Sequence, residues 1–150
     1  MRAVIQRVSE ANVSVDAVVC GSIRQGLLVL LAVEESDHTP DLEWLSGKIV
    51  RLRIFDDAEG LMNRSVQDTQ GEVLLVSQFT LFASTKKGNR PSFSRSARPE
   101  IAVRLYEQFR QRLAVDLGRP VQCGQFGAHM VVSLVNDGPV TVIIDSKSRE

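Results

Sequence analysis

The sequence has little of several features that mark familiar kinds of site. Among its 150 residues are only two cysteines, Cys20 and Cys123, which lie far apart and outside any CxxC or Cys/His cluster. Neither a disulfide framework nor a zinc site is predicted, and we expect both cysteines to be small buried residues in a reducing cytoplasm. No apolar run approaches membrane-spanning length, and the N-terminus lacks a signal-peptide core, so we expect a soluble cytoplasmic protein without membrane contact.

Net charge is also absent, because 18 basic residues balance 18 acidic ones. This balance argues against a protein that binds long nucleic acid mainly through its overall charge. The distribution is less even, since the segment from Val73 to Pro99 carries five basic residues and no acidic one: Lys86, Lys87, Arg90, Arg95 and Arg98. Such a run is usual in a solvated loop, and it would also suit guiding a phosphate backbone.

Histidine, the usual general base, occurs only twice. A nucleophile at Ser77 or Thr80 would need such a base, but His38 precedes a predicted helix and His129 lies in a glycine-flanked loop. The acidic cluster Asp56, Asp57 and Glu59 has the composition of a solubilising turn. The sequence therefore predicts neither a side-chain nucleophile with its base nor a metal or cofactor site.

The length suits one domain spanning residues 1–150. A helix is predicted from an N-cap at Thr39, with Pro40 in its first turn, and another from Pro99 to a stop at Gly118. Strand patterns surround them at 2–9, 12–20, 27–33, 53–55, 61–66, 73–81, 121–123 and 130–144, and 146–150 form a polar tail. We expect an α+β fold with a curved or barrel-like, mostly antiparallel sheet and two helices on one side.

The run from Val73 to Leu81 predicts a central strand covered on both faces. Its only polar breaks are Ser77, Gln78 and Thr80. These residues either end the strand by bonding neighbouring backbone, or form a polar notch where backbone N–H groups face a pocket.

A second stretch, Asn136 to Thr141, lies between two apolar runs. By itself Asp137-Gly138 is a hairpin signal, with Pro139 opening the returning strand. Taken together, however, Ser77 to Leu81 and Asn136 to Thr141 resemble the two signature motifs of the D-aminoacyl-tRNA deacylases. The resemblance extends to about Asp145 and includes the segments 1–8, 26–31, 52–55 and 87–93.

This resemblance implies hydrolysis of the ester bond of D-aminoacyl-tRNA. The 3′-terminal aminoacyl-adenosine would enter a pocket lined by Ser77, Gln78, Phe79 and Thr80. Backbone N–H groups around Phe79 and Thr80 would stabilise the oxyanion, with water or the tRNA 2′-hydroxyl assisting and no metal or cofactor.

The resemblance also implies a homodimer, in which a cis Gly138-Pro139 pair enters the partner's pocket. Its carbonyl oxygens would contact the substrate α-amino group and exclude L-amino acids, whereas glycine would escape this selection. Arg7 matches a residue that supports this pair, although a strand arginine facing solvent is the plainer interpretation.

Phe126 and Met130 resemble residues near the terminal adenine, and His129 departs from the acidic residue of many relatives. Two rival functions are a non-enzymatic RNA-binding barrel, stacking bases on Phe79, Phe82 and Phe93, and an ordinary esterase.

Overall fold

The sheet is built around strand β1 (Arg2–Val15), which pairs with other strands on both of its edges. The computed structural model describes residues 1–149. One edge of β1 pairs along nearly its whole length with β8, and the other edge pairs first with β3 and then with β2. Strand β6 joins β3 and β7 joins β6, both in parallel, so the sheet is mixed, with antiparallel pairs in the majority. The remaining strands are β2 (Val18–Ile23), β3 (Gly26–Ala32), β6 (Glu72–Ser77), β7 (Gln122–Cys123) and β8 (Val131–Asp145).

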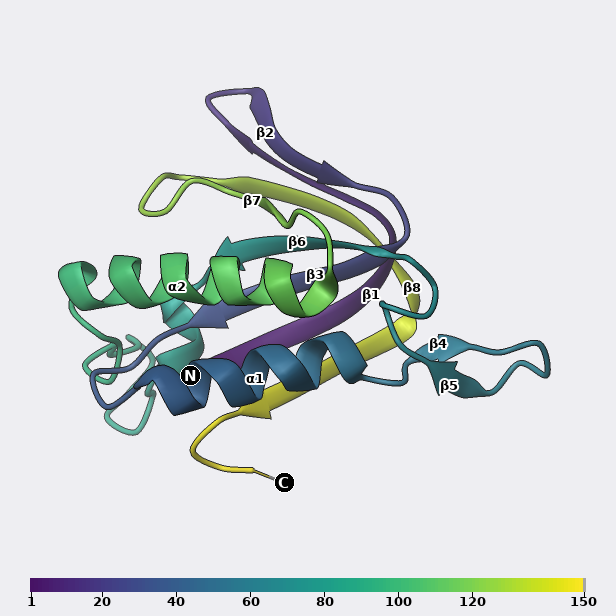
Figure 1. The fold of residues 1–150 in the computed structure, drawn as a ribbon. Coiled ribbons are helices and arrows are strands. Elements are labelled where there is room, and N and C mark those ends of the chain that lie inside the picture. The colour runs from purple at the N-terminus through teal and green to yellow at the C-terminus, as the bar shows by residue number, and fades with distance from the viewer. Residues whose placement is uncertain (150) are drawn as a thin grey trace.

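The sheet curls until β2 approaches β7, as Figure 1 shows at the top of the view. Gly21 in β2 marks this approach, because a Cβ added to it would lie 2.7 Å from the carbonyl oxygen of Cys123 in β7. The two helices lie on one face of the sheet, below the place where β2 approaches β7 (Figure 1). The predicted α+β fold, with a barrel-like and mostly antiparallel sheet, is confirmed.

The two predicted helices are α1 (Thr39–Arg51) and α2 (Pro99–Leu117), and each buries a stripe of apolar residues at helical spacing. In α1 the buried stripe includes Leu42, Leu45 and Ile49, and in α2 it includes Leu105, Phe109 and Leu113. Gly118 ends α2 with φ +77°, a left-handed conformation that glycine adopts without strain. The expected N-cap of α1 was one residue late: His38 is the cap, and its amide donates to the Asp41 carboxylate at 3.0 Å.

Three expectations about the strands and cysteines were wrong. Two strands were expected at 2–9 and 12–20, but residues 2–15 form one strand. The polar pair Ser9-Glu10 faces solvent within β1 and does not break it. The actual turn lies at Asp16-Ala17, where both residues have positive φ. Cys20, expected to be buried, is exposed on β2, and Cys123 is half-buried.

The hairpin interpretation of residues 136–141 was also wrong. Strand β8 keeps its direction through this segment and pairs with β1 on both sides of it, from Asp145 opposite Arg2 to Val131 opposite Ser14. The segment Asn136 to Val140, called the Gly-Pro loop below, is an irregularity within one long strand. It therefore projects from the sheet at a fixed point.

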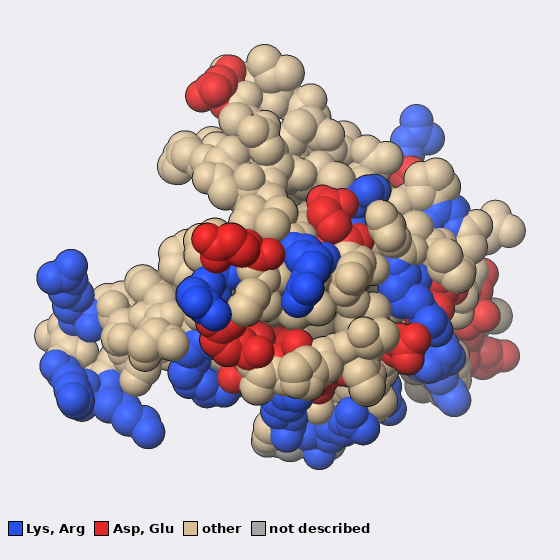
Figure 2. Space-filling view, turned by 60° about the vertical axis from the view of Figure 1, so that its left-hand side comes forward, with Lys and Arg blue, Asp and Glu red and all other residues tan. Residues whose placement is uncertain are grey.

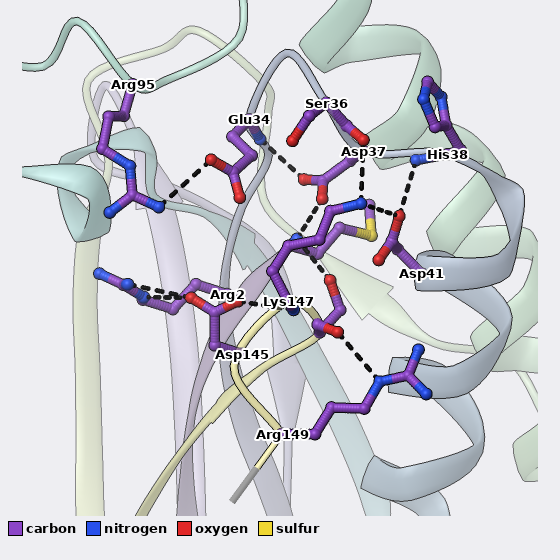
Figure 3. Close-up of polar contacts among 12 residues, drawn as sticks. Arg2, Glu34, Ser36, Asp37, His38, Asp41, Arg95, Asp145, Lys147 and Arg149 are labelled. Carbon is purple, nitrogen blue, oxygen red and sulfur yellow. Dashed lines mark hydrogen bonds and ion pairs between the residues drawn. The ribbon is translucent and has the colours of Figure 1, made fainter.

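A polar cluster joins the start of β1 and the end of β8, which lie side by side, to the connection between β3 and α1 (Figure 3). The buried Met1 ammonium group bonds Asp37 and, at 2.7 Å, the Ser146 hydroxyl, and Lys147 bonds the Asp41 carboxylate at 2.7 Å. The polar segment that follows β8 is therefore packed against this connection as far as Ser146 and Lys147.

Two short strands, β4 (Phe55–Asp56) and β5 (Met62–Arg64), form a separate hairpin. Within residues 1–149, no helix is long and apolar enough to span a membrane.

Candidate active site

A small apolar pocket lies where β3 and β6 end side by side. Ser77 ends β6 opposite Leu31, and the amide of Gln78 then donates to the Leu31 carbonyl at 2.7 Å. The carboxyl ends of parallel strands are a common place for ligands. The pocket has a volume of about 90 Å³ and is lined by Leu31, Ala32, Val33, Ser77, Gln78, Phe79, Ala97, Ala102, Tyr106, Phe126 and Gly127.

The polar residues at the rim are arranged around a short 3₁₀ helix, η1 (Phe79–Phe82). Phe79 and Thr80 begin this helix, so their N–H groups have no partner within it. Among the residues that the structure describes, neither amide has a hydrogen-bond acceptor. The Thr80 hydroxyl accepts a bond from the Gln78 side chain, and the Phe79 carbonyl accepts one from the Ser96 hydroxyl at 2.9 Å. Phe79 lines the pocket and Thr80 follows it outside the lining, so two consecutive free amides lie at the pocket edge beside a hydroxyl that accepts one hydrogen bond.

Two aromatic rings form one wall. Tyr106 and Phe126 have ring centroids 5.6 Å apart, and the Tyr106 hydroxyl donates to the Leu75 carbonyl in β6 at 3.1 Å. Burial raises the pKa of Tyr106 well above its ordinary value, so the hydroxyl remains a donor at neutral pH. This bond ties the wall to the strand that carries Ser77.

Sequence reasoning identified Phe126 but missed Tyr106 and the small residues Ala97 and Ala102. Tyr106 adjoins the buried stripe of α2, and it is the only tyrosine in the chain. A buried tyrosine needs a partner for its hydroxyl, which was an available signal.

Met130, which the resemblance places near the terminal adenine, and the two histidines are outside the pocket lining. Met130 packs in the second apolar cluster, close to Gly124 and Val13, and is not among the residues that line the pocket. His129 and His38 are exposed, and neither lines the pocket. Within residues 1–149, no group of three or more His, Cys, Asp or Glu side chains could hold a metal ion.

The Gly-Pro loop is held by a buried arginine from β1. Arg7, which is 8% exposed, donates from Nε to the Asp137 carbonyl at 2.8 Å and from a terminal nitrogen to the Ile54 carbonyl at 2.7 Å. The Asn136 side chain donates to the carbonyls of Arg7 at 2.9 Å and Val140 at 3.1 Å. The Gly138-Pro139 bond is cis. The alternative of a solvent-facing Arg7 was therefore wrong.

The pocket and the Gly-Pro loop lie apart within one chain. Ser77 pairs with Leu31, and Leu31 pairs with Ala3, near the start of β1. Arg7, beside the loop, lies about 13 Å further along β1 at about 3.3 Å per residue. Strands β8 and β6 are separated by β1 and β3, which adds about 14 Å across the sheet. A separation of roughly 15–20 Å follows, allowing for curvature.

A second cavity, of about 190 Å³, lies beside the loop and is lined by Arg7, Gln25, Phe55, Asp56, Arg64, Thr69 and Asp137. Within residues 1–149, none lines both cavities. The two stretches singled out in the sequence thus occupy different places on the chain.

Comparison with known proteins gives a consistent result. A sequence model of the family described as D-Tyr-tRNA(Tyr) deacylase matches residues 4–145. Proteins named D-aminoacyl-tRNA deacylase from Opitutus terrae and Dechloromonas aromatica are 63% and 59% identical to this chain over 150 residues, covering all of both chains.

Two solved structures have the same fold. One, described as a c-Myc DNA unwinding element binding protein, is 40% identical with a TM-score of 0.92, covering 97% of this chain and 98% of its own. Another, described as a probable eukaryotic D-amino acid tRNA deacylase, has a TM-score of 0.81 at 20% identity, covering 95% and 97%, and supports the fold alone. On the family match and the full-length relatives, this chain belongs to the D-Tyr-tRNA(Tyr) deacylase family.

Proposed function

We propose that this protein hydrolyses the ester bond of D-aminoacyl-tRNA, releasing the D-amino acid and tRNA. The observation that carries the mechanism is a pair of free amides, that of Phe79 in the lining of an apolar, aromatic-walled pocket and that of Thr80 next to it in the chain. The pocket would hold the terminal adenine against Phe126, and the amides would stabilise the oxyanion that forms on the ester carbonyl. Family membership supports the same reaction.

Water, aided by the 2′-hydroxyl of the substrate, would attack the ester. Among residues 1–149 no histidine lines the pocket, and the Thr80 hydroxyl accepts a hydrogen bond from the Gln78 side chain and has no base beside it. Ser77 and Gln78 would shape the rim. The reaction would then need no protein nucleophile, metal or cofactor, and would take place in the cytoplasm, where tRNA is aminoacylated.

Selection against L-aminoacyl-tRNA would come from the Gly-Pro loop of a second copy of the chain. The loop and the pocket of one chain lie roughly 15–20 Å apart by the strand spacings, so Gly138 and Pro139 would reach a pocket only across a two-fold dimer. Carbonyl oxygens of the loop would contact the substrate α-amino group. Glycyl-tRNA would also be hydrolysed, because glycine has no Cβ by which it could be rejected.

The surface around β8 suits such a dimer. Among residues 1–149, β8 pairs only with β1, so its other edge is free. Strand β8 also carries three exposed apolar side chains, since Val131, Val135 and Ile143 are 56%, 50% and 68% exposed. A second copy of the chain would cover them.

The decisive experiment compares purified protein on D-tyrosyl-tRNA and L-tyrosyl-tRNA. We expect hydrolysis of the D-isomer and glycyl-tRNA with little hydrolysis of the L-isomer. A nucleic-acid-binding protein, as one structural neighbour is described, would show no turnover, and an ordinary esterase would cleave simple esters without a nucleotide. Either result would overturn the proposal.

A variant separates the two possible roles of the rim. Thr80→Ala keeps the backbone amide, so we expect it to retain much of the rate, whereas loss of a true nucleophile costs several powers of ten. Near-complete loss with normal folding and tRNA binding would make the Thr80 hydroxyl the reacting group.

The dimer is tested by placing charge on β8. Ile143→Glu should give folded, inactive monomers by light scattering, whereas the control Val115→Glu, on an α2 residue that is 76% exposed, should remain dimeric and active. An Ile143→Glu monomer that hydrolyses D-tyrosyl-tRNA and still spares L-tyrosyl-tRNA would refute selection in trans.

A further inference from the structure

The loop that follows η1 carries the basic residues noted in the sequence, and the structure divides them into two groups. Arg95 pairs with Glu34 at 3.3 Å, as Figure 3 shows, and Arg98 pairs with Glu35 at 2.7 Å. The other three, Lys86, Lys87 and Arg90, are exposed and have no ion-pair partner within the described part of the chain. In a protein of zero formal net charge, these three form a local source of attraction for anions.

Figure 2 shows a projection at its left side that carries Lys and Arg and no Asp or Glu, whereas over the middle of that face basic and acidic side chains lie together. Backbone hydrogen bonds fix the two ends of the loop. The backbones of Ser84 and Ser92 bond each other at 2.8 and 2.9 Å, and the Ala97 amide donates to the Val33 carbonyl at 2.9 Å. The three free cations are therefore presented from a closed loop attached to the pocket wall.

An exposed aromatic side chain lies between the pocket and this loop. Phe79 lines the pocket and yet is 58% exposed. Its ring meets that of Phe93, from the loop, edge to face at 5.2 Å. The ring of Phe79 is thus supported on one side and open to solvent.

Phe82, the third candidate for stacking, is unavailable. It is 1% exposed, and the guanidinium groups of Arg2 and Arg95 lie 4.8 and 5.1 Å from its ring centre. Of the three phenylalanines considered for stacking, Phe79 and Phe93 are therefore the two placed to meet a base outside the pocket.

We propose that the exposed ring of Phe79, supported by Phe93, together with Lys86, Lys87 and Arg90, binds the single-stranded nucleotides that precede the terminal adenosine of tRNA. This inference rests on the proposed function, since the adenosine must occupy the adjoining pocket. An exposed aromatic ring beside cations is the usual arrangement for single-stranded nucleic acid, in which bases stack on the ring and phosphates meet the charges. The surface would bind the substrate through its 3′ end and contribute nothing to ester cleavage.

Three substrates of increasing length test this assignment: D-tyrosyl-adenosine, D-tyrosyl-CCA trinucleotide and full-length D-tyrosyl-tRNA. The charge variant replaces Lys86, Lys87 and Arg90 by Gln. A matched control replaces three exposed basic residues that do not line the pocket, Arg24, Lys48 and Arg53.

For the charge variant we expect kcat/KM to fall on the trinucleotide and on tRNA, and to equal the wild-type value on D-tyrosyl-adenosine. The slope of log kcat/KM on tRNA against log salt should flatten by about 2, because each of three charges meeting single-strand phosphates contributes about 0.7. Phe93→Leu should lower kcat/KM on the trinucleotide by about fivefold or more, in line with the loss of one stacked base, and spare D-tyrosyl-adenosine. The control should match the wild type throughout.

Other outcomes overturn the inference. Equal loss on all three substrates would place these residues in folding or in the pocket itself. Loss on tRNA alone would show that they contact the acceptor duplex, and no loss at all would show that they contact nothing. A wild-type protein inactive on every substrate would instead refute the proposed function, so the two failures are distinguishable.

Discussion

Replacing Arg7 by Met tests whether one buried guanidinium holds the Gly-Pro loop. Methionine is similar in length and removes both bonds, to the Asp137 and Ile54 carbonyls. A hydrogen bond to a charged group contributes about 1.5–3 kcal/mol. Because Asp137 is exposed and its carbonyl can bind water, we take the lower value for each bond. The expected loss in the free energy of unfolding is therefore about 3 kcal/mol.

At about 2–4 °C per kcal/mol for a chain of this size, the melting temperature should fall by roughly 6–12 °C. The carboxylates of Asp56 and Asp137, at 3.4 Å and about half exposed, should add little. Urea unfolding and calorimetry at one protein concentration measure the change. A matched control is Arg110→Met, which removes only a half-exposed pair with Glu107 and should cost less than about 0.5 kcal/mol. Equal melting temperatures for Arg7→Met and the control would refute the reasoning.

Three further changes address the pocket wall, the polar cluster and the sheet. Tyr106→Phe removes one of the two donors to the Leu75 carbonyl and leaves the Gly124 amide at 3.2 Å, so the free energy of unfolding should fall by about 1 kcal/mol, with a higher KM for D-tyrosyl-tRNA. Burial alone would raise the pKa of Asp41, but hydrogen bonds from Lys147 and the cap amide outweigh it and hold this pKa below 3.8. Its contribution to stability is therefore present above that pH and is lost as pH falls through the lowered folded-state pKa, and Asp41→Asn should make the free energy of unfolding fall less steeply as pH is lowered through this range. Gly26→Ala would place a Cβ 1.9 Å from a carbonyl oxygen of β6, so soluble protein should be lost or destabilised by about 3 kcal/mol or more.

The helices were predictable because their buried faces repeat at helical spacing and their ends carry chemical signals, as at Pro99 and Gly118. The strands were harder to delimit. Ser9-Glu10 has the polarity of a turn, but in β1 it lies where pairing with β8 changes register, and only the partner strand reveals this. The positive φ values at Asp16 and Ala17 likewise occur at residues other than glycine.

The candidate site was predictable in part. Ser77, Gln78 and Thr80 are recognisable in the sequence as polar residues within an apolar run, and Gly138-Pro139 is recognisable as a turn-like pair between two apolar runs. That two amides at the rim lack acceptors depends on how β6 ends against β3, which no local pattern specifies. The partners of Arg7 are backbone carbonyls from distant segments, and carbonyls carry no sequence signal.

The irregular pairing of β1 with β8 places a constraint on the length of the Gly-Pro loop. Between the pairs Gln6–Thr141 and Val8–Asn136, β1 advances two residues while β8 advances five; by the next pair, Glu10–Val135, β1 advances two and β8 only one. The total mismatch is two residues, an even number, so alternate side chains of β8 face the core both before and after the loop. Inserting or deleting a single residue would exchange the inward and outward faces of one half of the strand. Substitution within the loop is therefore compatible with the barrel, but its length can change only in steps of two unless the strand itself is rebuilt.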